Sequence, residues 1–174
     1  YSVDAATGRL KFTGKVAAGT TPWCVTIDPS GKFVYVANKN SNNISQYTIA
    51  ANGNLTPMAT PLVATESNPR SITIDSTGKY AYVTNYVSGS VSQYRIGADG
   101  MLTSMTIPAV AAEAQPISVA LNPKGKFAYV ANAGSASISQ YTIGADGSLI
   151  SMASPTVAAG PYPASITVDP GGTY

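Results

Sequence analysis

Residues 82–85 read Tyr-Val-Thr-Asn, and the close variant Tyr-Val-Ala-Asn stands 47 residues earlier, at 35–38, and 47 residues later, at 129–132. More of the surrounding sequence keeps the same spacing. Each copy opens with a proline, an Asp or Asn follows, then a glycine, and a Gln-Tyr pair comes after the tetrapeptide; the opening prolines are Pro22, Pro69, Pro116 and Pro163. A fixed period of this length predicts a repeat architecture.

One repeat, residues 69–115, shows the elements of the unit. Residues 71–74 and 90–96 alternate small or polar with apolar side chains, as strands do, and residues 80–83 are apolar on both faces. Asp75 and Gly78 predict a turn after the first strand, and Asp99-Gly100 predicts a hairpin before a fourth strand at 101–110. The repeat therefore predicts four antiparallel strands.

Four antiparallel strands per repeat are typical of a β-propeller blade, and the chain shows no helical periodicity. We predict an all-β chain with three complete blades and two partial ones, or about half of a ring, in a single partial propeller domain. The predicted pieces are the end of a blade at 1–21, blades at 22–68, 69–115 and 116–162, and the start of a blade at 163–174.

The tetrapeptides and the preceding Asp-Pro-x-Gly-Lys-Phe/Tyr turn resemble the YVTN-repeat propellers, which are similar to the seven-bladed 6-phosphogluconolactonase-like (lactonase) family. The resemblance covers the whole chain and implies a seven-bladed ring. Lactonases, cyclising isomerases and non-catalytic surface proteins all occur in the family. The expected partners are thus the missing blades, from the rest of the chain or a second copy.

Composition excludes several classes of function. Charged residues make up 10% of the 174 residues, the net charge is +2, and no basic cluster suggests nucleic-acid binding. No apolar run is long enough for a membrane span. The chain has no histidine and one cysteine, Cys24, which occupies a slot filled by serine in the other repeats. We therefore expect no metal site and no cofactor.

The repeat separates scaffold from site, because residues that recur in every copy serve the fold. Every Asp lies in or beside a predicted turn, the third-strand tyrosines are expected to pack between blades, and Asn38, Asn85 and Asn132 are expected to satisfy backbone groups. The residues that vary lie on one face, at the loop after the second strand and at the crossover between blades. This candidate face comprises Trp23, Lys39, Glu66, Arg70, Tyr86, Glu113, Gln115 and Tyr162.

Two of these residues suggest specific contacts. Glu66 and Arg70 are close enough in sequence to form an ion pair at the channel rim, or Arg70 could bind an anion or carboxylate. Trp23 could pack over the channel or offer a stacking platform.

We expect a non-catalytic propeller whose candidate face recognises a protein or a small carbohydrate-like ligand, outside the cytoplasm: secreted, periplasmic or at the cell surface. A cytoplasmic propeller could have the same composition. The alternative is a lactone hydrolase, for which Glu66 or Glu113 would serve as base and Arg70 or Lys39 would stabilise the oxyanion. The second alternative is a structural or filament subunit that self-assembles into oligomers.

Overall fold

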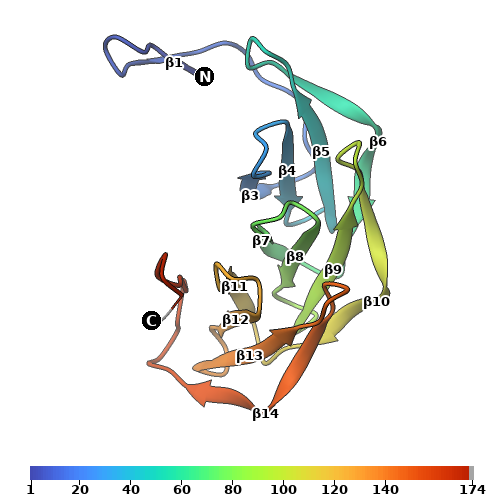
Figure 1. The fold of residues 1–174 in the computed structure, drawn as a ribbon, viewed down its shortest axis with the longest axis vertical. Coiled ribbons are helices and arrows are strands. Elements are labelled where there is room, and N and C mark those ends of the chain that lie inside the picture. The colour runs from blue at the N-terminus through green and yellow to red at the C-terminus, as the bar shows by residue number, and fades with distance from the viewer. Residues whose placement is uncertain (173–174) are drawn as a thin grey trace.

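The structure, a computed structural model, describes residues 1–172. Its strands form three four-stranded antiparallel sheets and one two-stranded hairpin, so each repeat folds into a blade as predicted (Figure 1). The hairpin pairs β1 (Ser2–Val3) with β2 (Leu10–Lys11). The first blade consists of β3 (Pro22–Ile27), β4 (Phe33–Asn38), β5 (Asn43–Ile49) and β6 (Leu55–Ala64). The second consists of β7 (Pro69–Ile74), β8 (Tyr80–Asn85), β9 (Ser90–Ile96) and β10 (Leu102–Ala111), and the third of β11 (Pro116–Leu121), β12 (Phe127–Asn132), β13 (Ser137–Ile143) and β14 (Leu149–Ala158).

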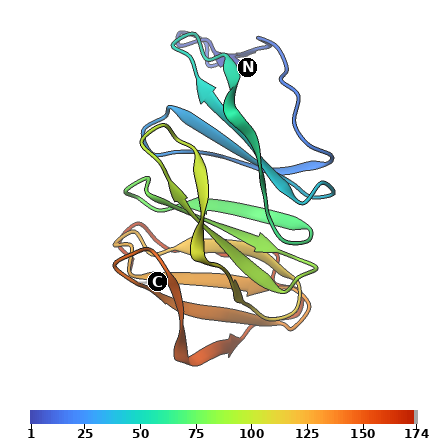
Figure 2. The ribbon, with the colours of Figure 1, turned by 90° about the vertical axis from the view of Figure 1, so that its right-hand side faces the viewer.

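The blades follow one another along an arc. The first strands β3, β7 and β11 lie on its inner side and the fourth strands β6, β10 and β14 on its outer side (Figure 1). Seen from the side, the three sheets are stacked face to face (Figure 2). The first strands therefore line the channel, as in a propeller.

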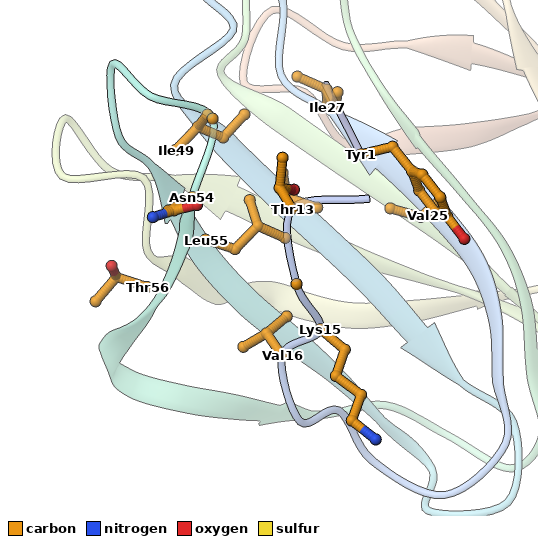
Figure 3. Close-up of a pocket in the computed structure, with 13 residues that line it drawn as sticks. Tyr1, Thr13, Lys15, Val16, Val25, Ile27, Ile49, Asn54, Leu55 and Thr56 are labelled. Carbon is orange, nitrogen blue, oxygen red and sulfur yellow. The ribbon is translucent and has the colours of Figure 1, made fainter. Parts of the chain in front are cut away.

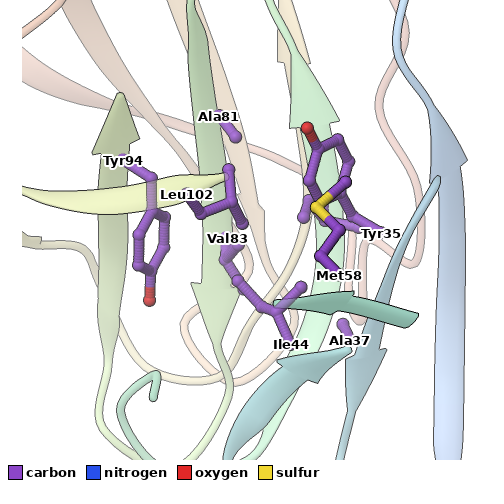
Figure 4. Packing of buried hydrophobic residues seen from close by; sticks show 9 residues of the cluster. Tyr35, Ala37, Ile44, Met58, Ala81, Val83, Tyr94 and Leu102 are labelled. Carbon is purple, nitrogen blue, oxygen red and sulfur yellow. The ribbon is translucent and has the colours of Figure 1, made fainter. Parts of the chain in front are cut away.

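The hydrophobic core lies between the blades. Between the first and second blades, Tyr35 and Ile44 on one side meet Val83 on the other (Figure 4). Ile72 belongs to the same cluster, and each of the four is at most 4% exposed. A second cluster, centred on Tyr82 and Val119, joins the second blade to the third. Strands buried on both faces explain why 80–83 is apolar throughout.

The third-strand tyrosines tie each blade to the one before it. The hydroxyl of Tyr94 donates a hydrogen bond of 2.7 Å to the carbonyl of Ala64, and that of Tyr141 donates one of 2.7 Å to Ala111. The prediction that these residues pack between blades is thus confirmed. Burial, with a smaller contribution from the charge of Glu66, raises the pKa of Tyr94 to about 12.

The turn aspartates serve the backbone, as the repeat predicts. Asp28 accepts hydrogen bonds at Oδ1 from the amides of Lys32 and Phe33, and at Oδ2 from the amide and hydroxyl of Ser30. Burial alone would raise the pKa of Asp28, but these bonds outweigh it and hold the pKa below its usual value.

The partial blades at the two ends differ from complete ones. The segment 163–168, which the repeat predicts as a first strand, has no strand assignment because the described chain supplies no second strand to pair with it. At the other end, the hairpin β1–β2 matches the predicted end of a third strand and start of a fourth. Residues 173–174 of the last predicted piece lie outside the described residues.

Candidate functional site

The candidate face is positioned by an unusual backbone feature that recurs before each opening proline. Thr21, Asn68, Gln115 and Tyr162 all have positive φ, between 56° and 64°. This left-handed conformation is uncommon for non-glycine residues and is found preferentially at functional sites. It turns the carbonyl of Asn68 toward the loop after β8, where it accepts a hydrogen bond of 2.9 Å from the amide of Tyr86.

The same bond forms in the other blades, from Lys39 to Thr21 and from Ala133 to Gln115. Each one holds the residue after the second strand close to the start of the first strand. The variable residues of the loop and of the first strand are thereby brought together at the channel.

Four of the predicted residues meet in one cluster between the first and second blades. The Arg70 guanidinium carbon lies 4.4 Å from the ring centroid of Trp23 and 4.4 Å from that of Tyr86. The Nζ atom of Lys39 lies 5.1 Å from the Trp23 ring. Each cation–π contact contributes roughly 0.5–1 kcal/mol near the surface. We call these residues, Trp23, Lys39, Arg70 and Tyr86, the channel cluster.

The Arg70 side chain is held in place through one of its nitrogens, and the other two have no described partner. The Nε atom of Arg70 donates a hydrogen bond of 2.8 Å to Oδ1 of Asn68. The backbone amide of Asn68 in turn donates to Oδ1 of Asn42 in the first blade. No protein acceptor among the described residues takes a hydrogen bond from the terminal nitrogens of Arg70. Because these nitrogens form a planar fork, the half-buried guanidinium can receive a carboxylate or phosphate edge-on. Trp23, 52% exposed, leaves room for a ligand beside it.

Glu66 does not pair with Arg70, so the expected ion pair is wrong. Instead Oε2 of Glu66 accepts a hydrogen bond of 2.6 Å from the hydroxyl of Ser90, which in turn accepts one from Asn85 Nδ2. Arg70 is held away by Asn68 and by the two rings. The carboxylate is exposed on the crossover, beside the start of β9.

The recurring asparagines also differ from expectation, because their amides serve side chains rather than the backbone. Asn85 Nδ2 donates to Ser90 and Ser92, and Asn132 Nδ2 donates to the equivalent Ser137 and Ser139. Asn38 Nδ2 donates to Ser45 and, where the other blades have a serine, to Oδ1 of Asn43. The Oδ1 atoms of Asn38, Asn85 and Asn132 are buried and lack a partner in the described part of the chain. This repeated acceptor is suited to a buried water in each blade.

The remaining predicted residues lie elsewhere along the same face. Glu113 is exposed on the crossover into the third blade, in the place that Glu66 takes one blade earlier. Gln115 is half-buried, and its side chain lies over Gly134 in the loop after β12. Tyr162, 71% exposed, precedes Pro163, the last of the four opening prolines. No contact with the channel cluster is described for these three, and their role in binding stays a prediction.

A cavity lies away from this face, at the uncovered side of the first blade. It encloses about 660 Å³ between residues 13–16 and the uncovered side of the first blade, and is lined by Val25, Ile27 and Leu55 (Figure 3). This is the face that a preceding blade covers in a complete propeller, so the cavity does not indicate a ligand site.

Residues 1–172 contain no cluster of metal-ligating side chains and no helix with the length and apolarity of a membrane span.

A family model described as "Lactonase, 7-bladed beta-propeller" matches residues 1–68 and 46–174, the whole of the chain. The chain belongs to this family. No curated protein gives a significant match.

Solved structures with the same fold include lactonases. A putative 6-phosphogluconolactonase from Bacteroides fragilis has a TM-score of 0.79 and 22% identity, over 93% of this chain and 47% of that one. A periplasmic gluconolactonase from Pseudomonas aeruginosa has a TM-score of 0.73 and 18% identity, over 82% and 41%. Hydrazine synthase from Kuenenia stuttgartiensis has a TM-score of 0.71 and 21% identity, over 95% and 44%.

The chain therefore spans about half the length of the structures it resembles. Identities this low show a common fold and leave the function to be argued from the site.

Proposed function

We propose that this chain forms part of a propeller that hydrolyses sugar lactones, with the channel cluster as its anion-binding element. The family match favours this function over the non-catalytic scaffold. The observation that carries the proposal is the Arg70 guanidinium, which contacts two aromatic rings and is anchored at Nε while its terminal nitrogens remain available. A site that fixes an arginine in this way is ready to bind an acidic sugar.

The chemistry requires few groups. Water adds to the lactone carbonyl, the ring C–O bond breaks, and the product is a hydroxy acid whose proton passes to solvent. The developing oxyanion needs a cation, a role that suits Arg70 or Lys39, and the attacking water needs a base. Glu66 is the carboxylate closest in sequence to the cluster, and its hydrogen bond from Ser90 fixes its orientation. Trp23 offers an apolar face to the sugar ring.

The test is hydrolysis of 6-phosphogluconolactone and glucono-δ-lactone by the purified protein. We expect Arg70→Ala to lower kcat/KM by 10²-fold or more, the usual size for a lost oxyanion contact. Arg95→Ala is the matched control, because Arg95 also contacts a tyrosine ring, that of Tyr80, but lies on a third strand. Hydrolysis unaffected by both Arg70→Ala and Glu66→Gln would refute the proposed roles.

If the purified protein has no lactonase activity, the non-catalytic function is favoured instead: a face that binds a ligand without turning it over. In that case the purified protein should still bind 6-phosphogluconate, and Arg70→Ala should weaken that binding. The two functions thus share a binding residue and differ in turnover.

A further inference from the structure

Arg70 is the extra residue of a β-bulge at the start of the second blade. Where β7 runs beside β8, Pro69 pairs with Asn85, and Ser71 pairs with Thr84. Arg70, between them, has no partner across the ladder. A bulge bends its strand and redirects the side chain of the extra residue. The bulge therefore accounts for the direction of the Arg70 side chain, which joins the channel cluster.

The bulge itself belongs to the repeat. The first and third blades have the same shift in register, with Trp23 and Ile117 as the extra residues. What differs in the second blade is the support on the two sides of the bulge, where side chains accept hydrogen bonds from the backbone.

Thr84 supports the side that follows the bulge. The amide of Ser71 donates a hydrogen bond of 3.1 Å to Oγ1 of Thr84, which is 0% exposed. Ala37 and Ala131 occupy the same repeat position in the first and third blades, and an alanine side chain has no acceptor. Among the three described blades, this bond therefore occurs in the one that carries Arg70.

Asn42 supports the side that precedes the bulge. The amide of Asn68 donates a hydrogen bond of 2.9 Å to Oδ1 of Asn42, which belongs to the first blade. Asn42 has a positive φ of 52°, and the residues at its repeat position, Gly89 and Ala136, have no side-chain acceptor. Asn68 in turn accepts the hydrogen bond from Nε of Arg70. Asn42 thus holds the residue that holds the guanidinium.

The blade forms without either acceptor. The third blade has alanine at both positions, Ala131 and Ala136, and still forms four paired strands. It also has Ile117 in place of the arginine. Both departures from the repeat therefore accompany Arg70, and neither is needed for the sheet.

We propose that Thr84 and Asn42 are positioning residues of the channel cluster. By holding the amides on both sides of the bulge, they keep the Arg70 guanidinium against the rings of Trp23 and Tyr86, with its terminal nitrogens available to an anion. A group held in its binding orientation loses less conformational freedom when the ligand arrives. The effect on a ligand rests on the proposed function, whereas the orientation of the guanidinium does not.

The neighbouring blades supply the substitutions for the test. Thr84→Ala introduces the residue of the first and third blades. Asn42→Gly introduces the residue of the second blade, and glycine adopts a positive φ without steric cost. Both variants should therefore fold. Thr84→Ser and Asn42→Asp retain an acceptor oxygen and are the conservative controls.

Trp23 reports the position of Arg70 without a ligand. We expect Thr84→Ala and Asn42→Gly to shift Trp23 emission to longer wavelength and to increase its quenching by acrylamide, as Arg70→Ala does more strongly. Thr84→Ser and Asn42→Asp should retain the emission of the parent. Tyr141→Phe, which removes a hydrogen bond between the second and third blades, should lower the midpoint of urea unfolding and leave the emission unchanged.

Binding of 6-phosphogluconate shows whether Thr84 acts through Arg70. We expect Thr84→Ala to weaken this binding about three- to tenfold, as for one lost hydrogen bond. In a chain that already carries Arg70→Ala, the same substitution should have no further effect, because residues that act through one group are not additive. A parent protein that does not bind 6-phosphogluconate would count against the proposed function, and Trp23 emission would still decide the positioning role.

Three results would overturn the proposal. The first is a lower urea midpoint for Thr84→Ala and Asn42→Gly with the emission of the parent in both, since the two side chains would then serve stability alone. The second is an equal emission shift in Thr84→Ala and Thr84→Ser, since the acceptor would then not be its cause. The third is an equal loss of binding with and without Arg70, which would show that Thr84 acts on another group.

Discussion

The hydroxyl of Tyr82 donates a hydrogen bond of 2.7 Å to the carbonyl of Gly147, a residue 65 positions later and in the next blade. The bond is completely buried, and it joins the middle of one sheet to a hairpin of its neighbour. An equivalent bond runs from Tyr35 to Gly100. The blades are therefore joined by specific polar contacts set within an apolar interface, and these contacts can be tested one at a time.

Tyr82→Phe should destabilise the chain by about 1–3 kcal/mol, because it leaves the buried Gly147 carbonyl without its donor. Tyr129→Phe is the matched control at the same repeat position, where the hydroxyl has no partner in residues 1–172, and should change stability by less than about 0.5 kcal/mol. Urea denaturation measures both. Equal effects of the two substitutions would show that the bond across the interface contributes nothing.

The hairpin glycines offer a second matched pair. Gly100→Ala and Gly53→Ala both place a side chain at a φ near +80°, which costs roughly 1–2 kcal/mol. Only the first also drives a Cβ into the ring of Phe33, which should add about 1–3 kcal/mol of overpacking. Gly100→Ala should thus have the lower midpoint in thermal and urea unfolding. Similar midpoints for the two variants would mean that the ring moves aside without cost.

The fold could be predicted from the sequence because every 47-residue copy repeats the same strand patterns and turn residues. The channel cluster could be predicted only in part. The repeat predicts Trp23 and Arg70 on the same face. For Arg70 it leaves two roles open, an anion site or an ion pair with Glu66, four residues away in the chain, and the ion pair does not form. The structure places Arg70 against Trp23, the residue at the same repeat position one blade earlier.

That difference has a physical reason. Neighbouring first strands lie side by side at the channel, so a residue's closest partners there are those at the same position in the adjacent repeat. Short-range spacing is a poor guide at a bend such as Asn68, whose positive φ is not apparent from a residue that precedes proline. Val25 is exposed, whereas Ile72 and Val119 at the same position are buried, because no complete blade covers the outer face of the first blade in the described residues.

Alkaline pH should unfold the chain through its buried tyrosines. The pKa of Tyr94 is raised to about 12 by burial, against about 10 in an unfolded chain, and burial also raises the pKa of Tyr35 and Tyr82. Because the neutral phenol is the favoured form in the fold, this stabilisation is fully present below about pH 10 and is lost as the pH rises toward 12.

The measurement is the unfolding free energy in urea at a series of pH values from about 8 to 12. Tyr94→Phe should give a shallower decline than the parent, whatever its own cost at neutral pH from the lost bond to Ala64. A decline of the same slope in both proteins would show that Tyr94 is not among the groups responsible.

The channel cluster can be monitored without any ligand, because Trp23 is the only tryptophan of the chain. Arg70→Ala removes the guanidinium from the Trp23 and Tyr86 rings at once, so we expect a loss of about 1–2 kcal/mol in stability. Trp23 should become more accessible to acrylamide, and its emission should shift to longer wavelength.

Arg70→Lys should restore little of the lost stability or of the original emission, since an ammonium lacks the planar group that stacks on a ring. Arg95→Ala, the same deletion at Tyr80, should leave the emission unchanged. If Arg70→Ala also leaves emission and quenching unchanged, then Arg70 does not cover Trp23 in solution, and the channel cluster is not a preformed site.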